Sequence, residues 1–463
     1  MATYAEAIAF LESFINYELH RGRMKYNTRA LHLRRFEHFL RSIGSPHRAI
    51  PLVHIAGTKG KGSTAVLLHS IAVEAGLHTG LYTSPHLESY CERIRIDRAP
   101  VSKRQFADAV ESLRQQLERD GVHLESGYRT TFELLTTVAF NIFRDESVDL
   151  GIIETGLGGR LDATNVIEPE VSVITAIGLD HTHLLGTTHA AIAREKAGIV
   201  KTGRPVVVAR QPSGHANEVL NTVHEICRRR GSLLYYAPRW VQIVSRTLRR
   251  DGQTVRYRLR GSATEIEVHL PLLGLHQAEN LRAALAVIAV LRTRRWTIPD
   301  SAIRLGVKKV RWPGRIEWLG EQPPFVLDGA HCPLSVEALV QTIREQRPGW
   351  RPVFVFSLLD DKPIEATVAP VARIFPGCEM VVFRAPTVRG CPPGALAGSL
   401  RTMGFLVEEA KSPSDALAAA ISCARRPHSL VVAFGSLYSV APLRNAYQQL
   451  TSPDLASQKQ SGK

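Results

Sequence analysis

The chain is 463 residues long, 44% hydrophobic and 22% charged, a composition typical of a folded globular protein and not of a disordered one. No apolar run approaches the roughly 18 residues that a membrane-spanning helix needs, and the length predicts two domains, because single domains usually run to about 100–200 residues. Lysine and arginine outnumber aspartate and glutamate by 58 to 43, which gives a formal net charge of +15 and predicts an anionic partner.

The chain begins with an amphipathic helical pattern in which Glu6, Glu12 and Glu18 stand among apolar residues. A secretory signal peptide instead has a basic start and an uninterrupted apolar stretch, so export is disfavoured. The six cysteines lie far apart and include no CxxC pair, which is typical of reduced thiols and disfavours a disulfide framework or a thiolate zinc site. We therefore expect a cytoplasmic protein.

Short apolar runs that end in Gly or Asp and precede helical patterns recur in the first part of the chain. They indicate strands of a mostly parallel sheet in an α/β domain. The predicted strands cover residues 51–57, 149–156, 171–178 and 205–209. Because open α/β sheets bind ligands at the carboxyl ends of their strands, the polar residues that follow these runs are candidate site residues.

The pattern changes over residues 233–271, where polar and apolar residues alternate. This alternation indicates antiparallel strands appended to the sheet. A helix is predicted from Gln277 to about residue 294, followed by a connector between Pro299 and Pro313.

Beyond the connector, strand and helix patterns alternate again and predict a second, smaller α/β domain over residues 313–450. The strand candidates are the apolar parts of FVLDGAHCP, PVFVFSLLDD, CEMVVFRAP and LVVAFGSLY. The tail over residues 451–463 is polar and is predicted to be disordered.

The segment HIAGTKGKGST, residues 54–64, follows an apolar run and precedes a helical pattern. Its glycines let backbone N–H groups approach phosphate oxygens, a helix N-terminus favours negative charge, and Lys61 can reach the outer phosphates. It departs from the usual GxxxxGK[ST] loop, because Ile55 stands at the first glycine and Gly62 at the hydroxyl. The short GxxGK match is a weak signal that a structural turn would also explain, but its place between strand and helix favours a phosphate cradle.

The missing hydroxyl after Lys61 means that other donors must help to hold Mg²⁺, which prefers octahedral oxygen coordination and keeps several waters. Ser84 in YTSPHL, Glu154 in IIETGLGGRLDATN and His181 in IGLDHTHLLG are candidates. Each alone could be structural, as a cap serine, a solvated glutamate or a loop histidine. Their shared position at predicted strand ends indicates a site.

Ten segments together carry a more specific signal, because they occur in the order and approximate spacing of one known family. They are GTKGKGST, TSPHL, ERIRI, ETGLGGRLDATN, LDHTHLLG, REKAGI, HQAENLRAAL, WPGRIE, LDGAH and FGSLY. Over about residues 10–445 the chain resembles the folylpolyglutamate synthase / dihydrofolate synthase family of the Mur ligase superfamily.

The resemblance implies a domain organisation. A Mur-ligase-like, P-loop ATPase domain with a mostly parallel sheet would cover residues 1–298, and a smaller Rossmann-like glutamate ligase domain would cover residues 313–450. Residues 299–312 would be the linker and hinge through which the second domain closes over the first, excluding water from a reactive intermediate. Residues 451–463 would be the disordered tail.

The resemblance also implies roles for individual residues. Ser84, Glu154 and His181 would bind magnesium directly or through water, with two ions expected. Arg315 would reach the ATP phosphates and Asp328 the ribose. The positions that would contact the nucleotide are Gly57, Thr58, Gly60, Lys61, Gly62, Ser63, Thr64, Asn280, Arg315 and Asp328.

Lys61, Lys196 and His331 would be catalytic, and Ser436 would bind substrate. Lys61 and His331 would act near the phosphates, with His331 also near the incoming glutamate, and Ser436 would bind glutamate. Lys196 matches a lysine that is carbamylated in this superfamily, where CO₂ turns an ammonium into a carboxylate-like group that orients a metal and its waters. Without the resemblance, Lys196 would be interpreted as a lysine on a helix surface.

The chain departs from the family pattern at Cys332, where Asn is usual, at Pro363, where Asp is common, and in LHLRRFEHFL near the pterin side. Cys332 fits a small packed residue better than a reactive thiol. These departures concern the substrate and not the ATP chemistry.

The resemblance implies an ATP-dependent ligase that forms an acyl phosphate on a carboxylate and couples it to L-glutamate. Its substrates would be folate or dihydropteroate, glutamate and ATP, acted on by a monomer without nucleic acid or membrane. Dihydrofolate synthesis, polyglutamate extension and both together stay open. The alternatives are a Mur-type ligase for another carboxylate and, from a different class, a nucleic-acid-binding NTPase, which the scattered basic residues disfavour.

Overall fold

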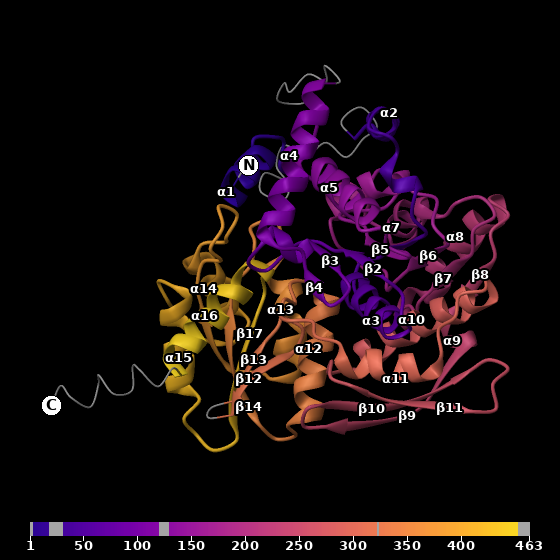
Figure 1. Ribbon diagram of the computed structural model, residues 1–463. Helices are drawn as coiled ribbons and strands as arrows, with labels where there is room; N and C mark the ends of the chain where they lie inside the picture. Colours follow the sequence, from indigo (N-terminus) through magenta and orange to yellow (C-terminus); the bar gives the residue numbers. More distant parts are fainter. Residues whose placement is uncertain (1–2, 18–30, 120–128, 322–323, 452–463) are drawn as a thin grey trace. The chain divides into compact units, whose positions relative to one another are not determined.

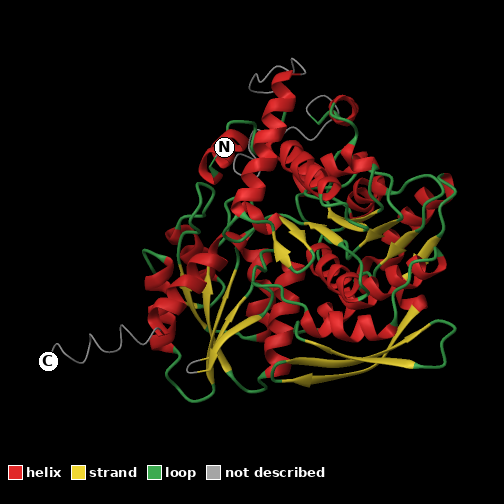
Figure 2. Ribbon diagram, in the orientation of Figure 1, coloured by secondary structure: helices red, strands yellow, loops and turns green. Residues whose placement is uncertain are grey.

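The computed structural model describes residues 3–17, 31–119, 129–321 and 324–451. It divides into two compact units, of which unit 1 comprises residues 1–271 and 276–310 and unit 2 comprises residues 272–275 and 311–463. Figure 1 labels the elements and Figure 2 shows that each unit combines helices with a sheet. Among the described residues no helix is both long and apolar enough to cross a membrane.

Unit 1 is built on an eight-stranded sheet in which β2, β5, β6, β7 and β8 run parallel to β1, while β3 pairs antiparallel with β2 and β4 pairs antiparallel with β3. In sheet order the strands are β4 (Ala99–Pro100), β3 (Ile94–Ile96), β2 (Thr79–Tyr82), β5 (Leu150–Glu154), β1 (Leu52–Ala56), β6 (Val171–Ile174), β7 (Val206–Val208) and β8 (Leu234–Tyr236). The four strands predicted for this region, β1, β5, β6 and β7, are confirmed.

Helices cover both faces of this sheet, which explains why its central strands are buried along their whole length (Figure 1). Leu52 and Ala56 point to the same face of the sheet. There Leu52 packs in a core with residues of α4 and α5, and Ala56 packs in a core with residues of α7 and α8. The unit's helices are α1 (Tyr4–Glu12), α2 (Leu33–Ser42), α3 (Lys61–Glu74), α4 (Lys103–Arg119), α5 (Thr131–Asp145), α6 (Thr182–Leu185), α7 (His189–Lys196), α8 (Ala216–Arg229), α9 (Ala237–Trp240), α10 (Leu275–Thr293) and α11 (Asp300–Lys309).

The prediction for residues 233–271 was partly wrong. The antiparallel strands β9 (Val241–Arg249), β10 (Gly252–Leu259) and β11 (Glu265–Leu270) form a separate three-stranded sheet instead of extending the large one. The first run, β8, pairs parallel with β7. Alternation correctly indicated a sheet with one buried face, but it carries no information about which strand pairs with which.

The predicted linker over residues 299–312 is corrected for most of its length, because Asp300–Lys309 form helix α11 within unit 1. Ile303 and Val307 are buried, and a Cβ on Gly306 would come within 2.5 Å of the Ile71 Cα of α3, so the two helices cross closely. Pro299 misled the prediction, because a proline at a helix N-terminus loses no hydrogen bond and marks the start of a helix as readily as a connector.

Unit 2 is built on a six-stranded sheet in which the edge strand β12 is antiparallel and the others run parallel. In sheet order the strands are β12 (Glu317–Glu321), β13 (Pro324–Leu327), β17 (Ser429–Phe434), β14 (Arg351–Phe356), β15 (Glu379–Val382) and β16 (Leu406–Glu409). The helices are α12 (Pro333–Gln346), α13 (Ile364–Ile374), α14 (Pro393–Thr402), α15 (Pro413–Cys423) and α16 (Val440–Thr451). The four predicted strands are confirmed, and the predicted disordered tail lies outside the described residues beyond Thr451.

Candidate active site

The glycine-rich turn between β1 and α3 is fixed by close packing. Gly57 and Gly60 have φ angles of 155° and 90°, and a Cβ on either would overlap a neighbour, Thr175 Oγ1 at 1.8 Å and Asn280 Oδ1 at 2.3 Å. The N–H groups of Thr58 and Lys59 both donate to Ala176 O, at 2.9 and 3.1 Å. The turn therefore needs glycine at these two positions, and it is held against the loop that follows β6.

Helix α3 begins at this turn with Gly60 as its N-cap, so no side chain caps its first N–H groups. Ser63 and Thr64 are buried, and within the described part of the chain Thr64 Oγ1 has no hydrogen-bond partner. Uncapped amides at a helix N-terminus favour an anion, and Lys61 adds a full positive charge at the first position of the helix. The turn has the features of a phosphate cradle.

Three of the predicted residues meet beside this helix. Lys61 Nζ lies 3.7 Å from Glu154 Oε1, and the Ser84 N–H donates to Glu154 Oε2 at 3.2 Å. Glu154 ends β5, which lies between β1 and β2 in the sheet, so the strand order brings these side chains together. With only 6% of its side chain exposed, Glu154 holds a buried negative charge at the carboxyl edge of the sheet.

His181 belongs to a second group of contacts, which is built on Lys59 and Asp180. Lys59 Nζ forms an ion pair with Asp180 Oδ2 at 3.2 Å, and Asp180 Oδ1 accepts the His181 N–H at 3.0 Å. His181 adopts a left-handed conformation with φ 51°, and its Nε2 lies 3.6 Å from Asp180 Oδ1. The Lys59 pair thus ties the glycine turn to the loop that carries His181.

Lys196, which ends α7, is buried and points at the glycine turn. Its Nζ donates to Gly57 O at 2.8 Å. Burial away from water, together with the nearby Lys61 ammonium, lowers the pKa of Lys196 to about 7. Without the family resemblance, Lys196 would be interpreted as a surface lysine. The structure shows instead that the residue is buried.

Asn280 lies near the start of α10 and touches the turn through Oδ1, which occupies the space beside Gly60. Its Nδ2 donates to Gln277 Oε1 at 3.0 Å, which fixes the orientation of the amide. Asn280, the residue of this helix that is predicted to contact the nucleotide, thus packs against the glycine turn.

In unit 2 the predicted residues gather where β13 and β17 end. Asp328 accepts the N–H groups of Ile316 and Ala330, at 2.8 and 2.6 Å, so its carboxylate organises the two loops that flank it. Gly435 N donates to Ala330 O at 2.7 Å, which joins the LDGAH turn to the FGSLY loop. The Arg315 guanidinium lies against Gly329. Its Nη1 is 2.8 Å from the position that a Cβ on this glycine would occupy.

The ring of His331 is oriented by a backbone contact. Its Nδ1 lies 2.7 Å from Gly329 O, which can only accept, so Nδ1 carries a proton. Ser436 is buried, and its Oγ accepts the Tyr438 N–H at 3.2 Å, so it caps a short helical turn. Cys332 is buried, as predicted for a packed residue.

The donors at the carboxyl edge fit a nucleotide-bound magnesium ion better than an ion in a protein cage. No three His, Cys, Asp or Glu side chains among the described residues are grouped as a metal site. Glu154 and Ser84 offer one carboxylate and one hydroxyl, and Mg²⁺ typically binds one or two carboxylates, phosphate oxygens and water. The chemistry of the donor set therefore suits Mg²⁺ that arrives with ATP.

Two residues that the sequence analysis did not single out organise this site. Asp180 pairs with Lys59, and Asp162 is buried and accepts from Leu157 N–H and from the N–H and hydroxyl of Thr164, at 2.8, 3.0 and 2.5 Å. Burial raises the Asp162 pKa. Asp180 lies in the motif LDHTHLLG and Asp162 in ETGLGGRLDATN. The available signal was therefore a carboxylate within the same motif as a predicted site residue.

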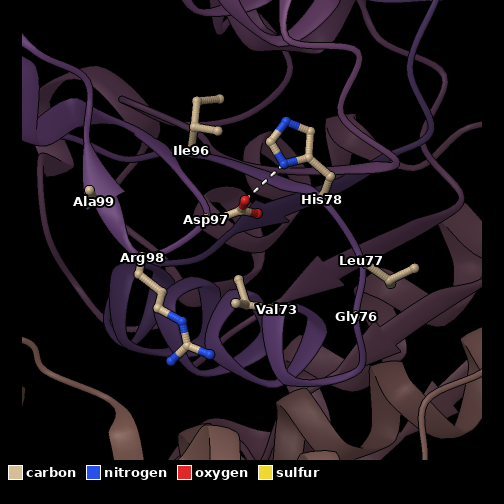
Figure 3. Close-up of a pocket in the computed structure, with 8 residues that line it drawn as sticks. All are labelled: Val73, Gly76, Leu77, His78, Ile96, Asp97, Arg98 and Ala99. Carbon is tan, nitrogen blue, oxygen red and sulfur yellow. Dashed lines mark hydrogen bonds and ion pairs between the residues drawn. The ribbon is translucent and has the colours of Figure 1, made fainter.

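A surface hollow lies elsewhere on unit 1, at the amino end of β2 (Figure 3). It has a volume of about 550 Å³, and His78 and Arg98 line it. The His78 Nδ1 to Asp97 Oδ2 contact of 2.8 Å crosses it. None of the predicted site residues lines this hollow, because they stand at the opposite, carboxyl end of the strands.

Comparison with known proteins identifies the family. The Mur ligase middle domain model matches residues 55–288, and the Mur ligase glutamate ligase domain model matches residues 314–437. The dihydrofolate synthase/folylpolyglutamate synthase of Bacillus subtilis is 33% identical over 430 residues, which cover 91% of this chain and 96% of that protein. The chain belongs to the folylpolyglutamate synthase / dihydrofolate synthase family of Mur ligases.

Solved structures of this family have the same fold. Folylpolyglutamate synthase of Mycobacterium tuberculosis complexed with ADP is 30% identical with a TM-score of 0.84, covering 96% of this chain and 99% of that one. An FPGS–AMPPCP–folate complex is 29% identical with a TM-score of 0.81, covering 97% and 100%. The Mur-ligase-like fold with a separate C-terminal α/β domain is confirmed, and the chain is an ATP-dependent C–N ligase of the folate synthase type.

Proposed function

We propose that this ligase moves the γ-phosphoryl group of ATP onto the carboxylate of a folate-type substrate and then joins that carboxylate to the amine of L-glutamate. The observation that carries the proposal is the meeting of Lys61, Glu154 and Ser84 beside the uncapped N-terminus of α3. A carboxylate is a poor electrophile, and an acyl phosphate supplies the leaving group that amide formation needs.

In the first step a substrate carboxylate oxygen attacks the γ-phosphorus and ADP leaves. Negative charge spreads over the transferring phosphoryl oxygens, so catalysis depends on positive charge placed in advance. Lys61 and the first N–H groups of α3 would supply it, with Asn280 packed against the turn. Magnesium bound with ATP would be held by Glu154, Ser84 and His181, directly or through water, and would neutralise phosphate charge.

In the second step the glutamate nitrogen attacks the acyl carbon, and the carbon–oxygen bond to phosphate breaks. The attacking amine must first lose a proton, because an ammonium has no lone pair. We assign this proton to His331, whose orientation is fixed by the bond between Nδ1 and Gly329 O and whose Nε2 would accept the proton. Arg315 would contact phosphate, Asp328 the ribose and Ser436 the glutamate.

For Lys196 we propose carbamylation, because a buried amine with a pKa of about 7 is partly neutral at physiological pH and can attack CO₂. The reaction forms a nitrogen–carbon bond and releases one proton. The carbamate nitrogen keeps one N–H, so the bond to Gly57 O can persist. Two magnesium ions, as the family resemblance implies, would then share the negative groups near the turn.

The ligase is proposed to act as a cytoplasmic monomer on small molecules, without nucleic acid. All six cysteines lie within the described residues and are free thiols, which supports a reducing compartment. Its positive charge is supplied in part by the lysines of the glycine turn, which are suited to polyphosphate rather than to a duplex. Sedimentation would give the mass, and nucleic acid that stimulates ATP hydrolysis would contradict the assignment.

The test is to incubate the protein with ATP, Mg²⁺ and glutamate together with dihydropteroate or tetrahydrofolate, and to measure ADP and the product masses. We expect a product heavier by one glutamyl residue with at least one of the two, and one ADP per bond. Product from dihydropteroate alone shows a dihydrofolate synthase, from tetrahydrofolate alone a polyglutamate-extending enzyme, and from both a bifunctional one. No folate product, with ADP formed only on another carboxylate, would contradict the folate assignment.

A further inference from the structure

The loop between β2 and β3, residues 83–93, delivers one of the site residues and has its own internal framework. It opens at Thr83, whose N–H donates to Arg93 O at 2.9 Å, so its two ends are joined. The next residue, Ser84, donates its N–H to Glu154 Oε2 at 3.2 Å. The conformation of this loop therefore decides where Ser84 stands relative to Glu154.

Glu92 holds the far part of the loop through its carboxylate. Oε2 accepts the Leu87 N–H at 2.9 Å, and Oε1 accepts the N–H groups of Glu88 and Ser89 at 2.9 and 2.7 Å. Three consecutive backbone N–H groups thus donate to one side chain. Such a run of amides can bind an anion, and here the Glu92 carboxylate is that anion. This part of the loop is fixed from within.

Arg93 holds the near part. Its side chain is only 2% exposed and is the largest fully buried side chain among the described residues. Nε donates to His86 Nδ1 at 2.8 Å, and the guanidinium carbon lies 5.1 Å from the Tyr90 ring centroid. The His86 ring lies 4.4 Å from the same Tyr90 ring, so the two side chains share one aromatic neighbour.

A buried guanidinium is costly and stays charged, so its neighbours must compensate for it. Because Arg93 Nε can only donate, His86 Nδ1 must accept, and the ring proton sits on Nε2. The contact thus fixes both the position and the tautomer of His86. His86 is two residues from Ser84, and the segment between them is held at one end by Arg93 and at the other by Glu154.

We propose that Arg93 is a positioning residue of the ligase: by holding His86 it places Ser84 against Glu154 in the arrangement that phosphoryl transfer requires. The inference rests on the proposed function of the Ser84 and Glu154 pair. It predicts an effect on turnover and on cation binding, with the affinity for the metal-free nucleotide nearly unchanged, because the glycine turn that holds the phosphates lies on a different loop.

The test compares Arg93→Met, His86→Leu and His86→Asn with the unaltered chain. Arg93→Met and His86→Leu should lower kcat about 10- to 100-fold, the usual effect of losing a partner that orients a metal-site residue, and should leave the affinity for ADP measured without a divalent cation within about threefold. His86→Asn should recover most of the turnover, because its Oδ1 can accept from Arg93 where Nδ1 did. The double variant Arg93→Met/His86→Leu should be no worse than the poorer single variant.

Two further measurements separate positioning from mere stability. Binding of Mn²⁺ in the presence of ADP, followed by electron paramagnetic resonance, should weaken about tenfold in Arg93→Met and His86→Leu. Nitrogen NMR of the histidine-labelled chain should show His86 protonated on Nε2. Arg98→Met is the matched control, because Arg98 is 58% exposed and pairs with Glu74 outside the loop, and it should change neither turnover nor Mn²⁺ binding.

The outcomes are distinguishable. If the unaltered chain forms no glutamylated product from either folate acceptor, the proposed function fails. If it is active but the folded Arg93→Met and His86→Leu proteins keep normal kcat and Mn²⁺ binding, or His86→Asn is as impaired as His86→Leu, the positioning role is wrong. Should Arg93→Met fail to fold, the two His86 variants, whose melting temperatures are measured alongside, decide the question.

Discussion

Lys61→Met is expected to lower ADP formation by at least about a hundred-fold while the chain stays folded. The methionine keeps the apolar stem of lysine but removes the charge that lies 3.7 Å from Glu154 and at the start of α3. Loss of a pre-placed group that stabilises transition-state charge costs about that much in other enzymes. The rate of ADP release, with circular dichroism to show folding, measures the effect.

Lys309→Met serves as the control for Lys61→Met, because Lys309 is also paired with a glutamate, Glu74 at 2.9 Å, but is 47% exposed on unit 1. An exposed pair contributes little, so this variant should keep full activity. Lys61→Met protein that forms ADP within a fewfold of the normal rate would show that the glycine turn does not hold the transferring phosphoryl group.

Lys196→Ala is expected to lower turnover about a hundred-fold and to regain part of it in the presence of formate or acetate. With a pKa of about 7, roughly half of the Lys196 amine is neutral at pH 7, and more at pH 8. The neutral form reacts with CO₂, so the unaltered enzyme should also lose activity when CO₂ is removed at low pH. A short carboxylate can enter the space that the truncated side chain leaves and replace the carbamate charge.

The matched control is Lys201→Ala. Lys201 Nζ also donates to a backbone oxygen, Asn165 O at 2.8 Å, and burial also lowers its pKa, but it lies away from the glycine turn. Added carboxylate should not change its activity. Carbon NMR with labelled CO₂ should show a carbamate signal that Lys196→Ala loses. A fully active Lys196→Ala enzyme, or no such signal, would exclude the carbamate.

The charges around the glycine turn explain why its conformation and its chemistry are linked. Lys59, Lys61 and Lys196 lie within reach of the same turn, and the carboxylates of Glu154 and Asp180 oppose them. The charges of Lys61 and Lys59 lower the pKa of Lys196, and the charge of Asp180 raises it. The side chains that hold the turn in place are therefore among those that set the protonation of Lys196.

The sequence predicted those parts of the molecule in which local pattern and long-range structure agree. Strands such as Leu150–Glu154 are continuous apolar runs because both faces of the parallel sheet are covered, and their ends place Glu154 at the binding edge. The glycine turn could be predicted for the same reason, since Gly57 and Gly60 need backbone angles that other residues rarely adopt.

The rest depended on contacts between residues far apart in the chain. The Lys59–Asp180 pair joins residues 121 positions apart, and no local pattern indicates which acid meets which base. Helix α11 was missed because Pro299 indicates a helix start as well as a loop, and only the packing of Gly306 against Ile71 distinguishes them. The burial of Arg93 could not be predicted from the sequence either, because arginine is usually exposed.

The most direct test of phosphoryl transfer to a carboxylate follows the oxygen atoms. A folate acceptor whose reacting carboxylate carries ¹⁸O is converted with ATP and glutamate, and the phosphate released is weighed. An acyl phosphate requires one carboxylate oxygen to leave with phosphorus, so we predict one ¹⁸O atom in each phosphate formed. Phosphate without the label, or label recovered in AMP, would contradict the account.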